Sequence, residues 1–240
     1  MIYLDYAADT PACDLALAAF TQTARTYGAN PNASHMPGQL AHARLTAAIQ
    51  HIADMLGCAA EEVVLTSGAT EANNMAILGI AHAYRSRGQH LITTPMEHSS
   101  VTAAMMALKA EGYSVDFVNV QPNGQVDISH LKTLMRADTV LVSVCAVDSE
   151  VGVIQPVHAL QDAIKDYPNC RLHVDATQAV GKFAQSLNVA DLYTFSPHKF
   201  YGLTGSGVLI VRGGLRLTPI MYGGTGATPY RSGTPALALT

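Results

Sequence analysis

The alternation of short β-branched runs with helix-like segments constrains the fold of this chain more than any other feature. Runs typical of strands lie at residues 62–66, 90–94, 115–120, 140–147, 171–175, 192–196 and 207–211. Helix-like segments precede or separate them, at 43–56, 71–87, 99–111, 127–136 and 156–166. This alternation predicts an α/β fold in which a mostly parallel mixed sheet lies between two layers of helices, a three-layer α/β/α arrangement.

The length and charge of the chain narrow its class. Its 240 residues fit one large domain, and only 13% of them are charged, which suits a large core and a surface partly buried in an oligomer. The net charge of −4 argues against nucleic acid or an anionic membrane as a partner. No apolar run reaches membrane-spanning length and the start of the chain lacks a signal-peptide pattern, so we expect a cytoplasmic protein.

The cysteines show no paired spacing, which argues against a zinc ribbon or a disulfide framework. They are Cys13, Cys58, Cys145 and Cys170. We expect each of them to be a small buried apolar residue.

Polar residues at strand ends are the candidates for a site, because ligands of such sheets bind beyond the carboxyl ends of the strands. Residues 67–71, Ser-Gly-Ala-Thr-Glu, lead from a strand into a helix, where free N–H groups and the helix dipole favour a phosphate. An ordinary helix cap explains the same residues. His98 follows the next strand and is either a ring-stacking or proton-moving residue or a loop histidine without a role.

Asp175 ends an apolar strand, where a carboxylate is costly unless a cation meets it or it caps a helix. The protonated pyridine nitrogen of pyridoxal 5′-phosphate (PLP) is such a cation, and Gln178 is near enough in sequence to reach the ring's phenolic oxygen. A metal site is the rival interpretation, but its ligands would lack a known spacing: His98, His173, Asp175 and His198.

Lys199 follows the strand at 192–196 in the segment Ser196-Pro197-His198-Lys199. A lysine that leaves an apolar strand into a loop suits Schiff-base formation, because partial burial favours the free amine. Ser196 and His198 are candidates for phosphate binding. A solvent-facing surface lysine is the alternative. The glycine-rich stretch 202–207 precedes a strand, so we interpret it as a turn and not as a dinucleotide loop.

Taken in order, these segments resemble the class V aminotransferase family of fold type I PLP enzymes, and within it the cysteine desulfurases. The resemblance covers nearly the whole chain. The motifs that carry it are Tyr3 to Ala8, Gly28 to Pro31 with Ser34-His35, Ser67 to Glu71, Glu97-His98, Ser149 to Gly152, His173 to Gln178, Ser196 to Lys199 and Arg231 to Thr234.

The resemblance implies a role for each site residue. Lys199 would hold PLP as a Schiff base and move the substrate's α-proton, and His98 would stack on the ring and assist proton transfer. Asp175 would pair with the pyridine nitrogen, and Gln178 would contact the phenolic oxygen. The phosphate would be bound by Ala69, Thr70, Ser196, His198 and, across a homodimer, Thr234.

The implied activity is that of a PLP-dependent cysteine desulfurase. Such an enzyme turns L-cysteine into L-alanine and passes the sulfur, as a persulfide on an enzyme cysteine, to iron–sulfur assembly or tRNA-thiolation partners. Two alternatives remain. One is another class V enzyme, a selenocysteine lyase or an aminotransferase, and the other is a non-catalytic fragment that binds PLP or forms the dimer.

The sequence departs from the family at several positions. Ser149 stands near the ring and the substrate where the desulfurases usually carry asparagine, and Asp9 replaces a threonine. Ala227 and Thr228 replace a Glu-Arg pair. The family continues past this chain into a small C-terminal domain with the nucleophilic cysteine. We therefore expect residues 1–240 to form the PLP-binding large domain, with 1–15 as an N-terminal arm and without the small domain.

Overall fold

The computed structural model describes residues 2–183, 187–224 and 228–240. The described part of the chain contains a seven-stranded sheet in the order β1-β7-β6-β5-β4-β2-β3. Its strands are β1 (Val63–Thr66), β2 (His90–Thr93), β3 (Ser114–Phe117), β4 (Thr139–Cys145), β5 (Arg171–Asp175), β6 (Leu192–Phe195) and β7 (Gly207–Val211). All neighbours from β3 to β6 pair in parallel, and β7 runs antiparallel to both β6 and β1. The predicted mostly parallel mixed sheet is confirmed.

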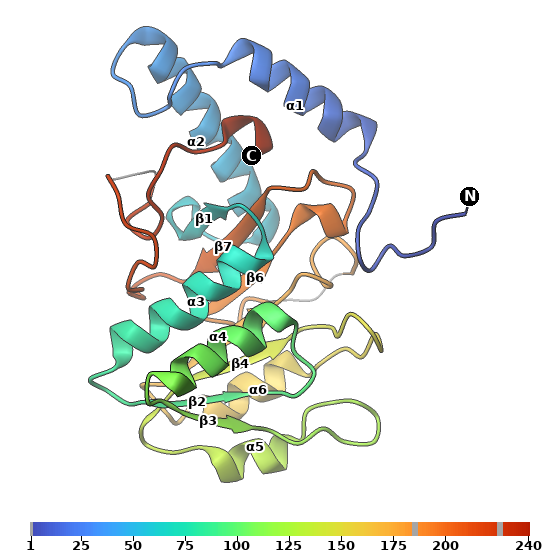
Figure 1. Ribbon diagram of the computed structural model, residues 1–240, viewed down its shortest axis with the longest axis vertical. Coiled ribbons are helices and arrows are strands. Elements are labelled where there is room, and N and C mark those ends of the chain that lie inside the picture. The colour runs from blue at the N-terminus through green and yellow to red at the C-terminus, as the bar shows by residue number, and fades with distance from the viewer. Residues whose placement is uncertain (1, 184–186, 225–227) are drawn as a thin grey trace.

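Helices cover both faces of this sheet (Figure 1). The helices α3 (Ala69–Tyr84) and α4 (Ser99–Ala110) lie on one face, and α5 (Ile128–Leu134) and α6 (Val157–Ile164) lie on the other. Successive residues of a strand point to opposite faces of the sheet and pack against different helices. On β4, Leu141 packs in the cluster with α3 and α4, whereas Val142 packs in the cluster with α5 and α6. The strands are therefore apolar on both faces, which explains their unbroken hydrophobic runs and confirms the three layers.

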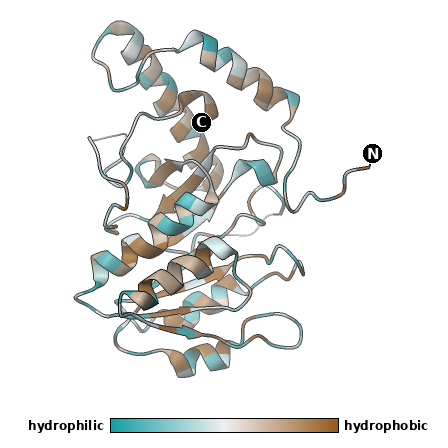
Figure 2. Ribbon diagram, viewed as in Figure 1, coloured by the Kyte–Doolittle hydropathy of each residue, from teal (hydrophilic) through white to brown (hydrophobic). Residues whose placement is uncertain are grey.

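The helix α1 (Asp14–Thr26) lies outside these layers, beside the last turn of the chain, Leu237–Leu239 (Figure 1). The helix α2 (Met36–Leu56) contacts the same turn, but its second half packs Ala53 into the cluster with α5 and α6. The sequence did not predict α1. Thr23 is its only buried residue, and Leu15 is 83% exposed, so its apolar residues do not mark a core-facing side. Figure 2 shows hydrophobic stretches along this exposed helix.

The helix α2 begins at Met36, seven residues before the predicted start at 43, and so includes Pro37 and Gly38. Pro37 lies in the first turn, where its missing N–H costs nothing. Gly38 is buried against Ala33, and a Cβ at this position would clash with the Ala33 backbone. Both residues therefore belong to the helix. No helix among the described residues is long and apolar enough to cross a membrane.

The cysteines divide into two groups. Cys145 and Cys170 are buried, as predicted. Cys13 is exposed and Cys58 is half-buried, so the prediction of four buried cysteines was wrong. Cys13 immediately precedes the exposed helix α1, and the sequence offered no sign that this segment lies outside the core.

Candidate functional site

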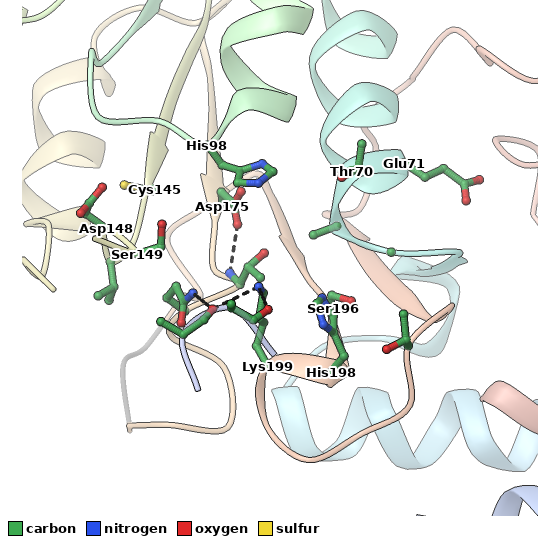
Figure 3. A pocket seen from close by; sticks show the side chains of 18 of the residues that line it. Thr70, Glu71, His98, Cys145, Asp148, Ser149, Asp175, Ser196, His198 and Lys199 are labelled. Carbon is green, nitrogen blue, oxygen red and sulfur yellow. Dashed lines mark hydrogen bonds between the residues drawn. The ribbon is translucent and has the colours of Figure 1, made fainter. Parts of the chain in front are cut away.

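A cavity of about 550 Å³ opens beyond the carboxyl ends of the central strands (Figure 3). Its walls come from α3, the loops after β2, β4, β5 and β6, and the N-terminal arm. The predicted site residues that line it are Ala69, Thr70, His98, Ser149, Asp175, Gln178, Ser196, His198 and Lys199. Thr234 is outside this set, and its hydroxyl accepts a hydrogen bond from Asn30 at 3.5 Å.

One end of the cavity, here called the aspartate end, contains Asp175 and His98. Asp175 is 5% exposed. Its Oδ1 accepts from the backbone N–H of Thr177 at 3.0 Å, and its Oδ2 accepts from Nδ2 of Asn73 at 2.8 Å. None of the salt bridges among the described residues includes this carboxylate. A buried carboxylate with two donors and no cation suits a cationic ligand group in the cavity.

His98 caps the N-terminus of α4 and lines the same cavity (Figure 3). Its Nδ1 accepts from the backbone N–H of Ser100 at 3.1 Å and lies 2.8 Å from the Ser100 hydroxyl. The cap thus fixes the imidazole plane through Nδ1 and leaves Nε2 unpaired by any described residue.

The loop between β2 and α4 is anchored by Glu97, the residue before His98. Its Oε1 accepts from the Thr94 hydroxyl and from the backbone N–H of Cys145, both at 2.8 Å. Burial raises the pKa of Glu97 to about 8, so this acid is mostly protonated at neutral pH. Burial also raises the pKa of Cys145, which therefore stays a thiol.

The other end, here called the lysine end, contains Lys199, His198 and Gln178. The Lys199 ammonium donates to the carbonyl oxygens of Ala8 and, at 3.1 Å, Ala7. Gln178 donates to the same Ala7 carbonyl at 2.9 Å. Residues of the N-terminal arm thus form one wall of the cavity, more than 170 positions away in sequence.

Asp9 binds His198 at this end, with 2.9 Å between its Oδ1 and the imidazole Nδ1. The hydrogen bond from His198 lowers the pKa of Asp9. Thr10 extends the contact, since its hydroxyl donates to the His198 carbonyl at 2.7 Å and accepts from the Tyr201 N–H at 2.6 Å. The Asp9 carboxylate therefore orients His198.

The start of α3 forms a floor of small residues on one side of the cavity (Figure 3). Gly68, Ala69 and Thr70 line the cavity there, with the free N–H groups that begin a helix. A Cβ on Gly207 would clash with the Gly68 backbone, so glycine is required where β7 passes this floor. Ser196 is 2% exposed and donates its hydroxyl proton to the Ser206 carbonyl at 2.8 Å.

Glu71 and Arg231 form an ion pair beside this floor that no sequence motif indicated. Arg231 Nε lies 2.5 Å from Glu71 Oε1, and Glu71 also accepts from the Ser67 N–H at 2.6 Å. Burial alone would raise the pKa of Glu71, but the bonds from Arg231 and Ser67 outweigh it and lower that pKa. The pair fastens the segment around Arg231 to the start of α3.

The residues present fit PLP at each of its polar groups. The floor offers N–H donors to a phosphate, Asp175 offers a buried carboxylate to a pyridinium, and Lys199 offers a primary amine in the same cavity. The rival metal site receives no support, because no group of three His, Cys, Asp or Glu side chains in the described residues is placed to hold a metal ion.

Comparisons with known proteins agree with this geometry. The family model described as aminotransferase class-V matches residues 2–235. A NifS/IcsS protein homolog of Lactobacillus delbrueckii is 39% identical over 99% of this chain and 63% of its own length. Cysteine desulfurase IscS of Glaesserella parasuis is 41% identical over 97% of this chain and 59% of its own length. The chain thus spans about 60% of the length of these relatives.

Solved structures share the fold closely. A NifS-like protein superimposes with a TM-score of 0.96 at 35% identity, over 99% of this chain and 66% of that one. A structure described as SspA in complex with cysteine gives a TM-score of 0.94 at 31% identity, over 100% of this chain and 70% of that one. A cysteine desulfurase from Thermococcus onnurineus gives 0.89 at 28% identity, over 99% and 64%.

Proposed function

The chain belongs to the class-V aminotransferase family, and from that premise we propose that residues 1–240 are the PLP-binding large domain of a cysteine desulfurase. The observation that carries the proposal is Asp175, a buried carboxylate with two N–H donors and no cationic partner among the described residues, facing the same cavity as the Lys199 amine. This arrangement suits PLP, whose pyridinium nitrogen would meet Asp175 and whose aldehyde would meet the Lys199 amine.

When bound, PLP supplies an electron sink that weakens bonds at the α-carbon of an attached amino acid. Each chain residue then has a separate task. Asp175 keeps the pyridine nitrogen protonated, His98 covers the ring, and Gln178 binds the phenolic oxygen. Lys199 attaches the cofactor and moves the α-proton. The phosphate is bound by Ala69, Thr70, His198 and Ser196, with Ser149 beside the ring.

The arm must exchange contacts when the cofactor binds. In the structure the Lys199 amine and the Gln178 amide both donate to the Ala7 carbonyl. Binding to PLP would use the same donors, so we propose that the arm carbonyls position both side chains beforehand. Asp9 fixes His198 through Nδ1, which leaves Nε2 for the phosphate.

L-Cysteine is the proposed substrate, because relatives over nearly the whole chain are described as cysteine desulfurases and one similar structure is described with cysteine bound. None of the four cysteines is suited to accept the sulfur. Cys145 lines the cavity, but its raised pKa disfavours the nucleophilic thiolate. Cys13, Cys58 and Cys170 do not line this cavity. We therefore propose a sulfur-accepting thiol outside residues 1–240.

The remaining proposals concern partners and setting. Thr234 lies outside the cavity, so we propose that it serves the partner's site in a homodimer, as the resemblance implies. We further propose a cytoplasmic protein whose sulfur reaches a sulfur-acceptor protein for iron–sulfur assembly or tRNA thiolation. The desulfurase relatives support the sulfur transfer in this scheme.

A borohydride experiment tests the proposal. The protein with added PLP should become yellow, and reduction should trap the cofactor on Lys199, as located by peptide mass spectrometry. Lys199→Ala should remove the trapped adduct, whereas Lys182→Ala, at a neighbouring lysine, should keep it. Trapping that survives Lys199→Ala unchanged would refute the assignment. Alanine release from L-cysteine with dithiothreitol as sulfur acceptor then tests the substrate.

A further inference from the structure

A fully buried asparagine, Asn73, lies beneath the aspartate end. Its Nδ2 donates to Asp175 Oδ2 at 2.8 Å and to the Ser100 hydroxyl at 2.9 Å. Its Oδ1 accepts from the Thr194 hydroxyl at 2.5 Å. Both amide hydrogens and the oxygen are therefore paired, so the orientation of the amide is fixed.

The bonds toward His98 have only one possible direction. The Ser100 backbone N–H can only donate, so His98 Nδ1, at 3.1 Å, must accept, and the ring proton lies on Nε2. The Ser100 hydroxyl oxygen already accepts from Asn73. Its own proton is thus free to donate to the same Nδ1 at 2.8 Å.

The bonds behind Asn73 also have a single direction. Because Thr194 donates its proton to Asn73, its oxygen can only accept from His173 Nε2 at 3.4 Å. His173 Nδ1 then accepts from the Ser143 hydroxyl at 2.8 Å. Burial lowers the pKa of His173 to about 4, so the ring carries one proton at neutral pH, as one donating and one accepting nitrogen require.

We propose that Asn73 is a positioning residue that sets both side chains facing the cofactor ring, Asp175 directly and His98 through Ser100. The inference rests on the proposed function, since it gives Asp175 and His98 a ring to contact. The hydrogen bonds around Asn73 form one path, in which every donor points toward the cavity. The path runs from Ser143 through His173 and Thr194 to Asn73, and from there to Asp175 and to Ser100 and His98.

The physical effect at the two side chains differs. At Asp175 the amide N–H donates to Oδ2 and fixes the plane of the carboxylate that would face a protonated pyridine nitrogen. At His98 the polarised hydroxyl keeps Nδ1 unprotonated, so that Nε2–H is presented to the cavity. A fully paired buried network of this kind also limits the rotamers of its members.

The first test compares Asn73→Asp with Asn74→Asp on the same helix. Asn74 is its half-buried neighbour, and its amide donates to the Thr70 carbonyl. In Asn73→Asp a carboxylate replaces the amide that donates to Asp175, so the bond that positions Asp175 is lost and like groups repel. We expect PLP affinity, measured by titration of the visible absorbance, to fall about tenfold or more, as for the loss of a hydrogen bond to a charged group. Asn74→Asp should leave it near wild type.

A second pair of variants covers the case in which Asn73→Asp does not fold. Thr194→Val keeps the shape and removes the donor to Asn73, whereas Thr194→Ser keeps the hydroxyl. The valine variant should bind PLP more weakly than the serine variant. Equal affinities in this pair, or in Asn73→Asp and Asn74→Asp, would overturn the inference.

The third readout does not depend on PLP. Nitrogen–proton correlation spectra of isotope-labelled histidine distinguish the two neutral tautomers of His98. The wild type should show Nε2–H. Ser100→Ala keeps the backbone donor to Nδ1 and removes only the hydroxyl, so the tautomer should stay and the Nδ1 resonance should move downfield, toward that of a nitrogen without a hydrogen bond. A wild type with Nδ1–H, or an Nδ1 resonance that Ser100→Ala does not move, contradicts the network. A protein that fails to bind PLP yet shows Nε2–H and this shift would refute the proposed function and leave the network in place.

Discussion

The two ends of the cavity are built in different ways. At the aspartate end, Asp175 and Asn73 are buried, and their bonds join strands and helices of the core. At the lysine end, Lys199 and His198 bind backbone carbonyls and the carboxylate of Asp9 in a partly exposed N-terminal arm. Substitutions at the aspartate end should therefore change stability and cofactor binding together, whereas those at the lysine end should change binding alone.

Acid should weaken the aspartate end first. The unfolded chain protonates histidine near pH 6.5, but buried His173 takes up its proton only near pH 4. Its contribution to stability is therefore complete above about pH 6.5 and is lost as the pH falls toward 4. With about 1.4 kcal/mol for each pKa unit, the loss at pH 4 is on the order of 3 kcal/mol.

Urea unfolding of wild type and His173→Gln between pH 7 and pH 4 measures this effect as a difference, because Glu97 opposes it over the same range. The unfolding free energy of the variant relative to wild type should rise by about 3 kcal/mol toward pH 4. Burial also lowers the pKa of His90, but that group is present in both proteins and cancels in the difference. A difference that does not change with pH would mean that the histidine beneath Asp175 is not buried as described.

Base should weaken the same end through Glu97. Its pKa is about 8 in the folded protein against an ordinary value of 4.5, so its contribution is complete below pH 4.5 and is lost as the pH rises through 8. From pH 6.5 to 8 the free energy of unfolding should fall on the order of 2 kcal/mol. Glu97→Gln, which stays neutral, should not show this fall in urea unfolding. Between pH 4.5 and 6.5 the contributions of Glu97 and His173 oppose each other.

Asp175→Ala compared with Lys199→Ala tests the difference between the ends directly. Removal of Asp175 leaves the donors of Asn73 and Thr177 unpaired in the core. It should cost about 1–2 kcal/mol of unfolding free energy, with water in the cavity limiting the loss. Lys199→Ala should stay within about 0.5 kcal/mol of wild type. Both variants should lose PLP trapping. Equal destabilisation of the two variants would show that the two ends do not differ in their coupling to the core.

Asp9→Asn should have the smallest effect. The Asp9 side chain is 54% exposed, and exposed ion pairs contribute little. We expect no measurable change in the urea midpoint, and PLP affinity within about threefold of wild type because asparagine can still accept from His198. A midpoint shift as large as that of Asp175→Ala would show that the arm is part of the core.

Sequence reasoning identified the site residues at strand ends. It missed the residues that position them through contacts between distant parts of the chain. Asp175 stands out because it ends an apolar strand, and Lys199 because it lies in the short segment that leaves one. Asn73 gives no such signal, since it lies inside a helix without unusual neighbours. The Glu71–Arg231 pair joins positions 160 residues apart, and only the path of the chain brings them together.

The sequence by itself determined the elements of the sheet, its two apolar faces and the chemistry offered at the strand ends, because periodicity and residue type are local properties. Tertiary structure decided the order of the strands, the antiparallel β7, the exposed α1 and the partners of Asp175. Those depend on contacts between distant residues. Asn73 meets Asp175 and Thr194 across 102 and 121 positions, and such contacts form only when the whole core packs.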